Sequence, residues 1–368
     1  MNKQVNGRLS GIELLKIIAI LAVVIGHVTQ TLVTANADVA FSDYVLPIGS
    51  ATRSAQLLTV NILYYFGTCI GNSVFFVCSA WFMVGNSKST LHKAIWMIVD
   101  VWTVSVLFLA AYMVALHGAV PAKTIIRSLL PTTFSNNWYI TAYIVFLFIY
   151  PLLNIIIDRL TQRELLGLTI LFSFMYIGVN FLSYGKFLYS DLLLWASVYF
   201  IIAYIKIYMP EFQNDVKSNF IILLAGIAGF VGIIVLTDIL GLRIPFFSDK
   251  LLYWKKNCNP FGILIAIGAL NLMRQTSFKS RAINYVSSLS MLIYLIHENI
   301  MVRTYTRPAI WQWIYSTFGY GHIVLLILIY ALALFIAAAA LAAVYKAAIQ
   351  KITKLLASRI ASRISITE

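Results

Sequence analysis

Charged side chains are scarce in this chain of 368 residues. Only 11% of the residues are Asp, Glu, Lys or Arg, and 61% are apolar. Soluble globular proteins have about 25% charged and roughly 45–50% apolar residues, so a soluble fold could not bury this much apolar surface. The three cysteines, Cys69, Cys78 and Cys258, are too few and too scattered for a disulfide scaffold or a zinc ligand set. No metal site is therefore expected.

The formal net charge is +14, because Lys and Arg outnumber Asp and Glu. A strongly basic chain can bind nucleic acid, but here the cations punctuate apolar runs and form no basic patch interleaved with aromatic residues. Cationic loops that face anionic lipid explain this distribution better. The 23 Phe, 21 Tyr and 8 Trp residues exclude a disordered chain. The sequence thus indicates a protein of the lipid bilayer that binds no nucleic acid, and it leaves the oligomeric state open.

The apolar runs predict an all-α, polytopic integral-membrane helix bundle, because about 20 helical residues cross a bilayer. The second run is long and interrupted by Gly67 and Gly71, which favours a kinked or partly re-entrant helix. The eighth run is short, so a count of nine or eleven spans stays open beside the expected ten. The predicted spans are 11–34, 57–84, 91–116, 137–157, 165–184, 190–209, 219–240, 259–273, 283–302 and 322–345.

The basic residues also predict an orientation. With ten spans, one side of the membrane receives sixteen Lys and Arg residues and the other side ten, with Lys16 inside the first span. The side that is richer in cations is cytoplasmic, so both termini are expected there. Residues 1–345 are predicted to form one membrane domain. Residues 346–368 alternate cations with Ile and Leu and predict a basic amphipathic tail on the inner leaflet.

Ionisable residues within spans are costly to desolvate and often functional. The first span carries Glu13, Lys16 and His27. At about 100° per residue, Lys16 and His27 lie within roughly 20° of each other on the helix surface, with His27 about 16 Å further along the axis. Glu13 precedes Lys16 by three residues and can pair with it. This polar stripe is expected to face the interior of the bundle.

Other polar residues within spans are weaker candidates. Asp100 and Asp238 are lone carboxylates that can cap a polar pocket or form a buried pair. The sequence His297-Glu298-Asn299 forms a polar cluster near the end of the ninth span, where water can satisfy the imidazole. The small polar residues between Asn72 and Phe82 are typical of helix packing.

Four segments in order resemble the integral-membrane acyltransferase 3 family of bacterial enzymes. The first runs from Gly11 through Lys16 to His27, where the family shows a basic residue, ten others and His. The second, 72–82, has aromatic residues followed by Ser79 and Ala80, where the family has Ser-Gly. The third is 137–154, with its Trp-aromatic start and Pro-Asn end, and the fourth is 293–299, with Tyr, Leu and His. Lys16 stands where Arg is usual, so a point charge replaces a bidentate group.

The resemblance implies transfer of an acyl group, commonly acetyl, from cytoplasmic acyl-CoA to a hydroxyl of a surface or lipid-linked saccharide. The acyl-CoA is a substrate, and no bound cofactor is implied. His27 is the expected general base or acyl carrier, since His titrates near neutral pH. Further catalytic candidates are Glu13, His297 and Glu298; the donor-binding candidates are Lys16, Lys88 and Lys93; and the substrate-binding candidates are Ser79, Trp138, Tyr139, Tyr143 and Arg303.

Two other classes remain open. Intramembrane Glu, Asp and His would also suit a proton-coupled secondary transporter or saccharide exporter, although the two halves of the sequence show no repeat. A membrane sensor that keeps the scaffold without catalysis is the third hypothesis, and Lys16 in place of Arg favours it. Acyl transfer by purified protein, or substrate accumulation without modification, would discriminate an enzyme from a carrier.

Overall fold

The computed structural model of the protein describes residues 9–33, 46, 49–86, 90–187, 189–248 and 250–365. These segments contain helices and no strand, which confirms the predicted all-α class. The first helices are α1 Ser10–Val33, α2 Ala55–Met83, α3 Leu91–Ala115, α4 Ala122–Leu129 and α5 Trp138–Arg159. Next come α6 Gln162–Ser173, the π-helix η1 Phe174–Val179, α7 Asn180–Leu182, α8 Asp191–Tyr208, α9 Pro210–Asn214 and α10 Val216–Gly241. The last are α11 Pro245–Ser248, the short 3-10 helix η2 Leu251–Lys255, α12 Pro260–Arg274, α13 Arg281–Ser287, α14 Ser290–His297, the π-helix η3 Val302–Thr306, α15 Arg307–Phe318, α16 Ile323–Ala348 and α17 Gln350–Ser365.

Eight helical stretches of the described chain are long and apolar enough to cross a bilayer. Each coincides with one of the ten predicted spans; one of them, Gln162–Leu182, runs through α6, η1 and α7. The other two predicted spans take different forms. Residues 259–273 form the shorter apolar helix α12, and residues 283–302 are divided among α13, α14 and the start of η3. Every predicted apolar run is therefore helical, but two of them are not single long helices.

The second span is one continuous α-helix of 29 residues, so the expected re-entrant break is absent from it. Gly67 and Gly71 face α1. A Cβ atom on Gly67 would lie 2.3 Å from the carbonyl oxygen of Ala22 and 2.6 Å from the amide nitrogen of Gly26. Small residues at such contacts let helix backbones approach closely within a membrane. These glycines thus set the distance between α1 and α2.

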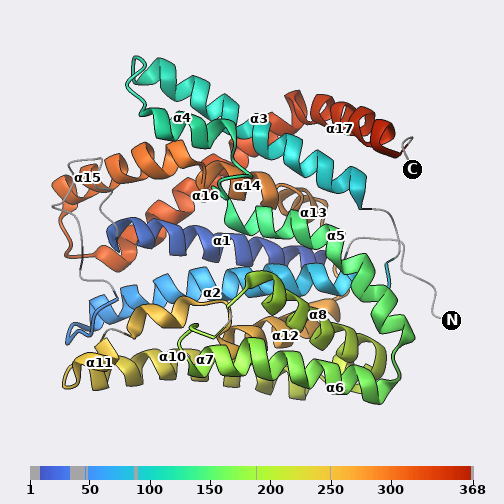
Figure 1. The fold of residues 1–368 in the computed structure, drawn as a ribbon. Coiled ribbons are helices and arrows are strands. Elements are labelled where there is room, and N and C mark those ends of the chain that lie inside the picture. The colour runs from blue at the N-terminus through green and yellow to red at the C-terminus, as the bar shows by residue number, and fades with distance from the viewer. Residues whose placement is uncertain are drawn as a thin grey trace.

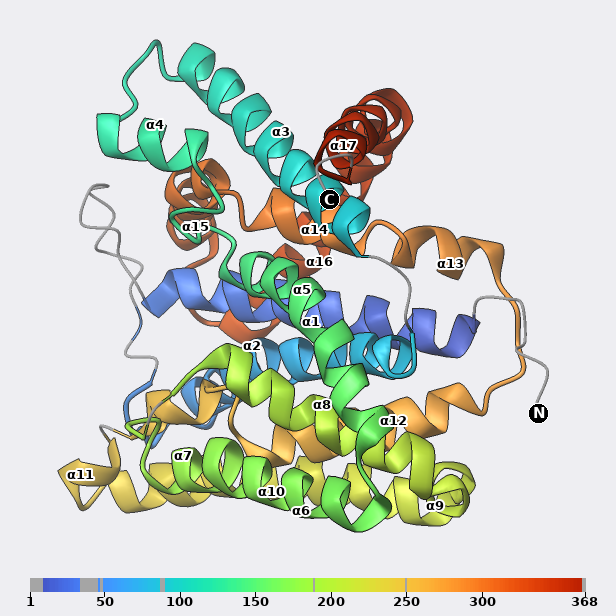
Figure 2. The same cartoon turned by 45° about the vertical axis from the view of Figure 1, so that its right-hand side comes forward.

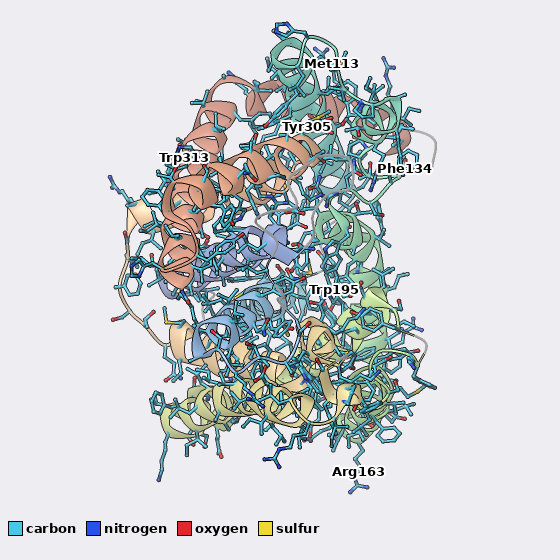
Figure 3. All side chains as sticks on the ribbon, turned by 90° about the vertical axis from the view of Figure 1, so that its left-hand side faces the viewer. Met113, Phe134, Arg163, Trp195, Tyr305 and Trp313 are labelled. Atoms are coloured by element: carbon cyan, nitrogen blue, oxygen red, sulfur yellow. The ribbon has the colours of Figure 1, made fainter. Side chains whose placement is uncertain are left out.

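The polar helix α1 lies in the middle of the bundle (Figures 1 and 2). Helices α2 and α12 lie on one side of it, and α14, α15 and α16 lie on the other. Helices α6 and α10 form one outer edge of the molecule, and α3, α4 and α17 form the opposite edge. Side chains fill the space between the layers, with Trp195 inside the bundle and Arg163 at its edge (Figure 3). The stripe of α1 is thereby enclosed, as the sequence predicts.

The outer helices leave much apolar surface uncovered by protein. In the span of α1, 67% of the residues are buried inside the molecule, compared with 22% in the span of α10 and 28% in that of α16. Large side chains such as Ile221 and Leu236 on α10 are about half exposed. Contiguous apolar surface of this extent is rare on soluble monomers, and lipid chains cover it in a bilayer. This pattern agrees with an integral-membrane bundle.

The predicted amphipathic tail forms α17, and this helix packs against the first half of α3 at one edge of the bundle (Figure 2). Ala357 and Ala361 are buried there against Ile95 and neighbouring residues of α3. In the view of Figure 1, the start of α1 and the end of α17 both lie towards the right-hand end of the molecule. The tail is therefore attached to the membrane domain through protein contacts, in addition to any contact with lipid.

The two lone carboxylates of the spans have structural partners. Asp100 on α3 is fully buried and accepts hydrogen bonds from the hydroxyls of Tyr345 and Thr353, at 2.9 and 2.6 Å. Asp238 on α10 accepts a bond of 3.0 Å from the backbone amide of Thr52, just before α2. Each carboxylate thus joins helices that are distant in sequence.

Candidate active site

Two histidines from distant parts of the chain meet in the bundle. His27 lies on α1, and His297 is the last residue of α14. The Nδ1 atom of His27 lies 3.0 Å from the Nε2 atom of His297, and the ring centroids are 5.3 Å apart. The expectation that water satisfies His297 is not met, because this side chain is fully buried and bonds to protein groups.

The hydrogen bonds indicate which ring nitrogens carry protons. The Nδ1 atom of His297 lies 2.7 Å from the carbonyl oxygen of Ile293. A carbonyl only accepts, so this Nδ1 carries a proton and, in the neutral ring, Nε2 is an acceptor. His27 then donates its Nδ1 proton to His297, which leaves the lone pair of His27 on its Nε2. His27 is therefore the ring that can accept a proton from a substrate, and His297 orients it.

Glu298 is buried beside the histidine pair. Its Oε2 atom lies 3.1 Å from Nδ1 of His27 and 3.1 Å from Nη1 of Arg307. Its Oε1 atom accepts a bond of 3.2 Å from Nη1 of Arg303. A carboxylate at the protonated nitrogen of an imidazole fixes the ring and stabilises the imidazolium that forms when the ring takes a second proton. The two arginines hold this carboxylate in its ionised form.

The turn after α14 brings the arginines to Glu298. A π-helical turn, η3, leads directly into α15, and such turns occur frequently at functional sites. Nη1 of Arg307 donates to the carbonyl oxygen of His27 at 3.2 Å, and the indole nitrogen of Trp311 donates to that of Val28 at 2.9 Å. Helix α15 is thus attached to α1 at the level of the candidate base.

His27, His297 and Glu298 also offer three potential ligand atoms within 4.8 Å of one another, a spacing at which His and carboxylate side chains can bind a metal ion. The carboxylate of Glu298 already forms ion pairs with Arg303 and Arg307. Two guanidinium groups beside a site oppose the binding of a further cation. The group is better suited to proton transfer than to metal binding.

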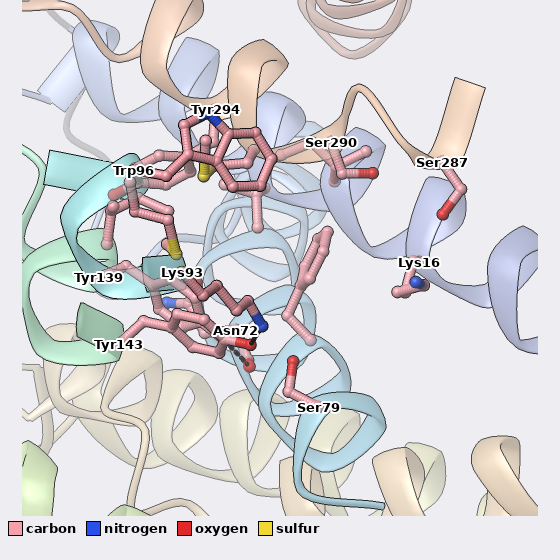
Figure 4. Close-up of a pocket in the computed structure, with 16 residues that line it drawn as sticks. Lys16, Asn72, Ser79, Lys93, Trp96, Tyr139, Tyr143, Ser287, Ser290 and Tyr294 are labelled. Carbon is pink, nitrogen blue, oxygen red and sulfur yellow. Dashed lines mark hydrogen bonds between the residues drawn. The ribbon is translucent and has the colours of Figure 1, made fainter. Parts of the chain in front are cut away.

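A cavity of about 210 Å³ adjoins this group through Tyr294, which lines it. Figure 4 shows the residues of its wall. The ammonium group of Lys93 donates a bond of 3.2 Å to the hydroxyl of Tyr143 and lies 5.3 Å from the centroid of its ring. The structure therefore brings together five of the residues predicted for donor and acceptor binding. These lining residues are Lys16 on α1, Ser79 on α2, Lys93 on α3, and Tyr139 and Tyr143 on α5.

A second hollow of about 340 Å³ extends the cavity. It shares Lys16 and Lys93 with the first and continues past Met83 and Asn86, at the C-terminal end of α2. The two hollows together lead from this end of the bundle towards the histidines. Their shared cations make the passage suitable for an anionic molecule.

Tyr294 stands between the cavity and the histidine pair. Its ring lines the cavity, and its centroid lies 6.2 Å from that of His27 and 5.7 Å from that of His297. Val23, one helical turn before His27, lines the same wall. A molecule in the cavity would reach His27 by passing this tyrosine ring.

Glu13 lies apart from the histidines with which it was predicted to act. Its Oε2 atom lies 2.8 Å from the ammonium nitrogen of Lys16, and the hydroxyl of Ser287 donates to the same oxygen. Fourteen residues of helix separate it from His27, a rise of about 21 Å. Glu13 therefore positions Lys16 at the cavity and does not contact the candidate base.

Two other predicted residues, Trp138 and Arg303, do not line the cavity. Trp138 packs against Tyr139, with ring centroids 5.6 Å apart at 81°, and does not line the cavity. Arg303 binds Glu298 instead of the cavity. Lys88 falls outside the described residues.

Arg307, Tyr294 and Trp96 are residues of the site that no sequence pattern above assigns to it. Arg307 is 1% exposed and forms an ion pair with Glu298. The spacing of four residues between Arg303 and Arg307 was an available signal, because it places both on one helical face. Tyr294 lies within a recognised motif but received no role, and no pattern singled out Trp96.

An apolar helix bundle with a buried His–His–Glu group beside a cation-lined cavity defines a membrane protein with an enzyme-like polar centre. The sequence model of a family described as an acyltransferase domain matches residues 9–345, nearly the whole chain. The chain therefore belongs to the acyltransferase 3 family, and the predicted resemblance is confirmed. It is a membrane acyltransferase. No curated protein and no solved structure matched the chain significantly.

Proposed function

We propose that this acyltransferase moves an acyl group, such as acetyl, from cytoplasmic acyl-CoA to a hydroxyl of a surface or lipid-linked saccharide. The observation that carries the proposal is the orientation of His27. Its Nδ1 faces His297 and Glu298, at 3.0 and 3.1 Å, so that its Nε2 is available as a base. This base adjoins a cavity lined by cations and aromatic rings.

The chemistry of the cavity suits the arm of an acyl-CoA. CoA carries phosphates, and Lys16 and Lys93 supply positive charge along the passage. A volume of about 210 Å³ is below the roughly 300–1,000 Å³ of pockets that enclose drug-sized ligands. It suits the acyl group and the pantetheine arm, with the nucleotide outside. The faces of Tyr139 and Tyr143 provide apolar walls for that arm.

In the proposed transfer, Nε2 of His27 takes the proton from the acceptor hydroxyl as its oxygen attacks the thioester carbonyl. The new C–O ester bond forms, the C–S bond breaks, and the CoA thiolate takes the proton from the imidazolium. Glu298 stabilises the imidazolium while it exists, and Arg307 and Arg303 keep Glu298 ionised. In a second route His27 is acylated first and then passes the group to the hydroxyl. Trapping of an acyl-protein in the absence of acceptor distinguishes the two routes.

Reconstitution in lipid vesicles tests the proposal. Protein supplied with radiolabelled acetyl-CoA and a lipid-linked saccharide should release free CoA and form an acetylated saccharide. The His27→Ala variant should form neither product. Accumulation of unmodified saccharide across the vesicle membrane, without CoA release, would instead identify a carrier and overturn the proposal.

Binding of the donor is tested with lysine variants. Lys16→Ala should weaken acyl-CoA binding, because the variant removes a cation from both hollows of the passage. The matched control is Lys217→Ala, which removes an exposed cation at the start of α10, outside both hollows. An equal loss in both variants would attribute the effect to net charge and exclude a specific role for Lys16.

We also propose that the protein resides in a bacterial cytoplasmic membrane with both termini in the cytoplasm. The excess of Lys and Arg on one side of the predicted spans supports this orientation. So does the placement of the start of α1 and the end of α17 at the same end of the molecule in Figure 1. Single cysteines introduced by Lys3→Cys and Arg363→Cys can be labelled from either side, since the native cysteines are buried. Labelling of the two positions from opposite sides would contradict the proposed orientation.

A further inference from the structure

A cationic hollow lies between the N-terminal end of α3 and α17, separate from the cavity of the candidate active site. Its volume is about 440 Å³. Its lining combines basic groups with aliphatic side chains, and most of it comes from α17. The lining residues are His92, Lys351, Ile352, Lys354, Leu355 and Ser358.

We propose that this hollow binds the headgroup of an anionic phospholipid, with the phosphate near Lys351 and Lys354 and an acyl chain along Ile352 and Leu355. No residue of the hollow belongs to the active site, and α17 lies beyond residues 9–345, which match the family. The site is therefore additional to the acyltransferase machinery and goes beyond the proposed function.

The hollow is preformed because buried hydrogen bonds hold α17 on α3. Asp100, fully buried on α3, accepts hydrogen bonds from Thr353 on α17 and from Tyr345 at the end of α16. Ala357 and Ala361 pack against α3 one and two turns further along. A buried carboxylate with three side-chain donors, Gln350 being the third at 3.4 Å, is costly to separate from them. The lysines are thus presented in a fixed place.

The charge of the hollow is only partly compensated by protein, through the buried carboxylate of Asp100 on α3, which interacts with Lys354. No carboxylate among the described residues forms an ion pair with Lys351 or Lys354. Basic pockets beside membrane helices on the cytoplasmic side bind anionic lipid headgroups, and each cation near the surface contributes attraction. A phosphate between the two ammonium groups would supply the missing negative charge.

The apolar part of the lining favours a lipid over a free phosphate compound. Ile352 is 67% exposed and Leu355 is 54% exposed. Large aliphatic side chains beside cations are the pattern of helices at a membrane interface, where lipid chains cover them. A nucleotide or inorganic phosphate would leave these side chains uncovered.

The hollow adjoins the wall of the donor cavity. The ammonium nitrogen of Lys354 lies 4.6 Å from the centroid of the Trp96 ring, and Trp96 lines the cavity of the active site. A phosphate bound to Lys354 would therefore lie close to Trp96, a side chain that forms part of the wall of the donor cavity. His92 and Lys93 are neighbours on α3, and they line the hollow and the cavity respectively.

Native mass spectrometry of the detergent-purified full chain, titrated with dioleoyl phosphatidylglycerol, tests the proposal. The wild type should retain this lipid in preference to dioleoyl phosphatidylcholine. The Lys351→Ala/Lys354→Ala variant should bind phosphatidylglycerol roughly tenfold or more weakly, since two cations are lost. The matched control, Arg359→Ala/Arg363→Ala, removes two cations from the same helix outside the hollow and should keep nearly wild-type affinity.

Three outcomes would overturn the proposal. If the lysine variant binds phosphatidylglycerol with wild-type affinity, the hollow is excluded as the lipid site. An equal loss of affinity in both double variants would indicate diffuse electrostatic attraction of the lipid to α17. Displacement of bound phosphatidylglycerol by CoA or inorganic phosphate would show a site for free phosphate compounds. If the lysine variant fails to fold by gel filtration, Ser358→Trp, which fills the hollow and keeps both lysines, should weaken lipid binding in its place.

Discussion

The Nδ1 atom of His27 lies 3.0 Å from the Nε2 atom of His297, although 270 residues separate them in the chain. The contact forms only when α14 packs against α1. The Nδ1 atom of His297 forms a hydrogen bond with the carbonyl oxygen of Ile293. The orientation of the candidate base, His27 on α1, therefore depends on the backbone of α14. The geometry of the candidate base is thereby tied to the packing of α14 against α1.

Removal of either histidine should reduce acyl transfer, but to different extents. His27→Ala removes the proposed base, and the loss of a general base typically costs 10²–10⁴-fold in rate. His297→Ala should cost less, because Glu298 still lies 3.1 Å from Nδ1 of His27 and can orient it. Initial rates of CoA release with the vesicle-reconstituted protein measure both effects.

His322→Ala is the control for these variants, since this histidine is exposed at the start of α16, outside the site. It should transfer acyl groups at the wild-type rate. If His297→Ala proves more damaging than His27→Ala, the assignment of base and orienting residue is reversed.

The two arginines at Glu298 should contribute differently to stability. Arg307 is 1% exposed, whereas the side chain of Arg303 is 35% exposed. Breaking a buried ion pair costs about 3–5 kcal/mol, and an exposed pair contributes about 0.2–1 kcal/mol. Arg307→Leu should therefore lower the midpoint of thermal unfolding far more than Arg303→Leu, as measured by tryptophan fluorescence in detergent. Similar shifts for both variants would contradict the assignment of Arg307 as the buried partner.

The local features of this site were predictable from the sequence, because helical periodicity is local. The spacing of Lys16 and His27 placed both on one face of a helix, and the structure encloses that face. The same rule gave Glu13 as the partner of Lys16, at 2.8 Å. The helical rise alone also places Glu13 about 21 Å from His27 along the axis. The rule could not show that His297 meets His27 and not Glu13, because that contact depends on how α14 packs against α1.

Contacts between distant segments were beyond the reach of pattern analysis. Arg307 follows the ninth apolar run, where the sequence pattern predicts a loop, but η3 and α15 fold back onto α1 and bury it. The amphipathic pattern of the tail predicted α17 correctly. That α17 docks on α3 depends on Ala357 and Ala361, two small residues four apart whose packing role is visible only beside their partner helix.

Tyr294 should control the access of water and donor to the histidines. Tyr294→Ala removes the ring that stands between the cavity and His27, so water should reach the thioester more readily. The ratio of acyl-CoA hydrolysis to saccharide acylation should therefore rise. Tyr294→Phe keeps the ring and should keep the wild-type ratio. A rise of similar size in Tyr294→Phe would assign the effect to the hydroxyl and exclude the ring as a barrier.

The close contact of α1 and α2 should be intolerant of a single methyl group at Gly67. A Cβ there would lie 2.3 Å from the carbonyl oxygen of Ala22, so Gly67→Ala must push the helices apart. Overpacking of this kind costs about 1–3 kcal/mol, and a displacement of His27 by about 1 Å can reduce the rate about 10²-fold. The variant should unfold at a lower temperature and transfer acyl groups more slowly.

Gly232→Ala on α10 makes the same substitution where no atom lies within 4 Å of the added Cβ. Because alanine favours a helix over glycine by about 1 kcal/mol, this control should be as stable as the wild type or more so, with full activity. Thermal unfolding and CoA release measured on both variants separate the contact from helix propensity. Equal behaviour of the two alanine variants would mean that the α1–α2 distance does not position the candidate base.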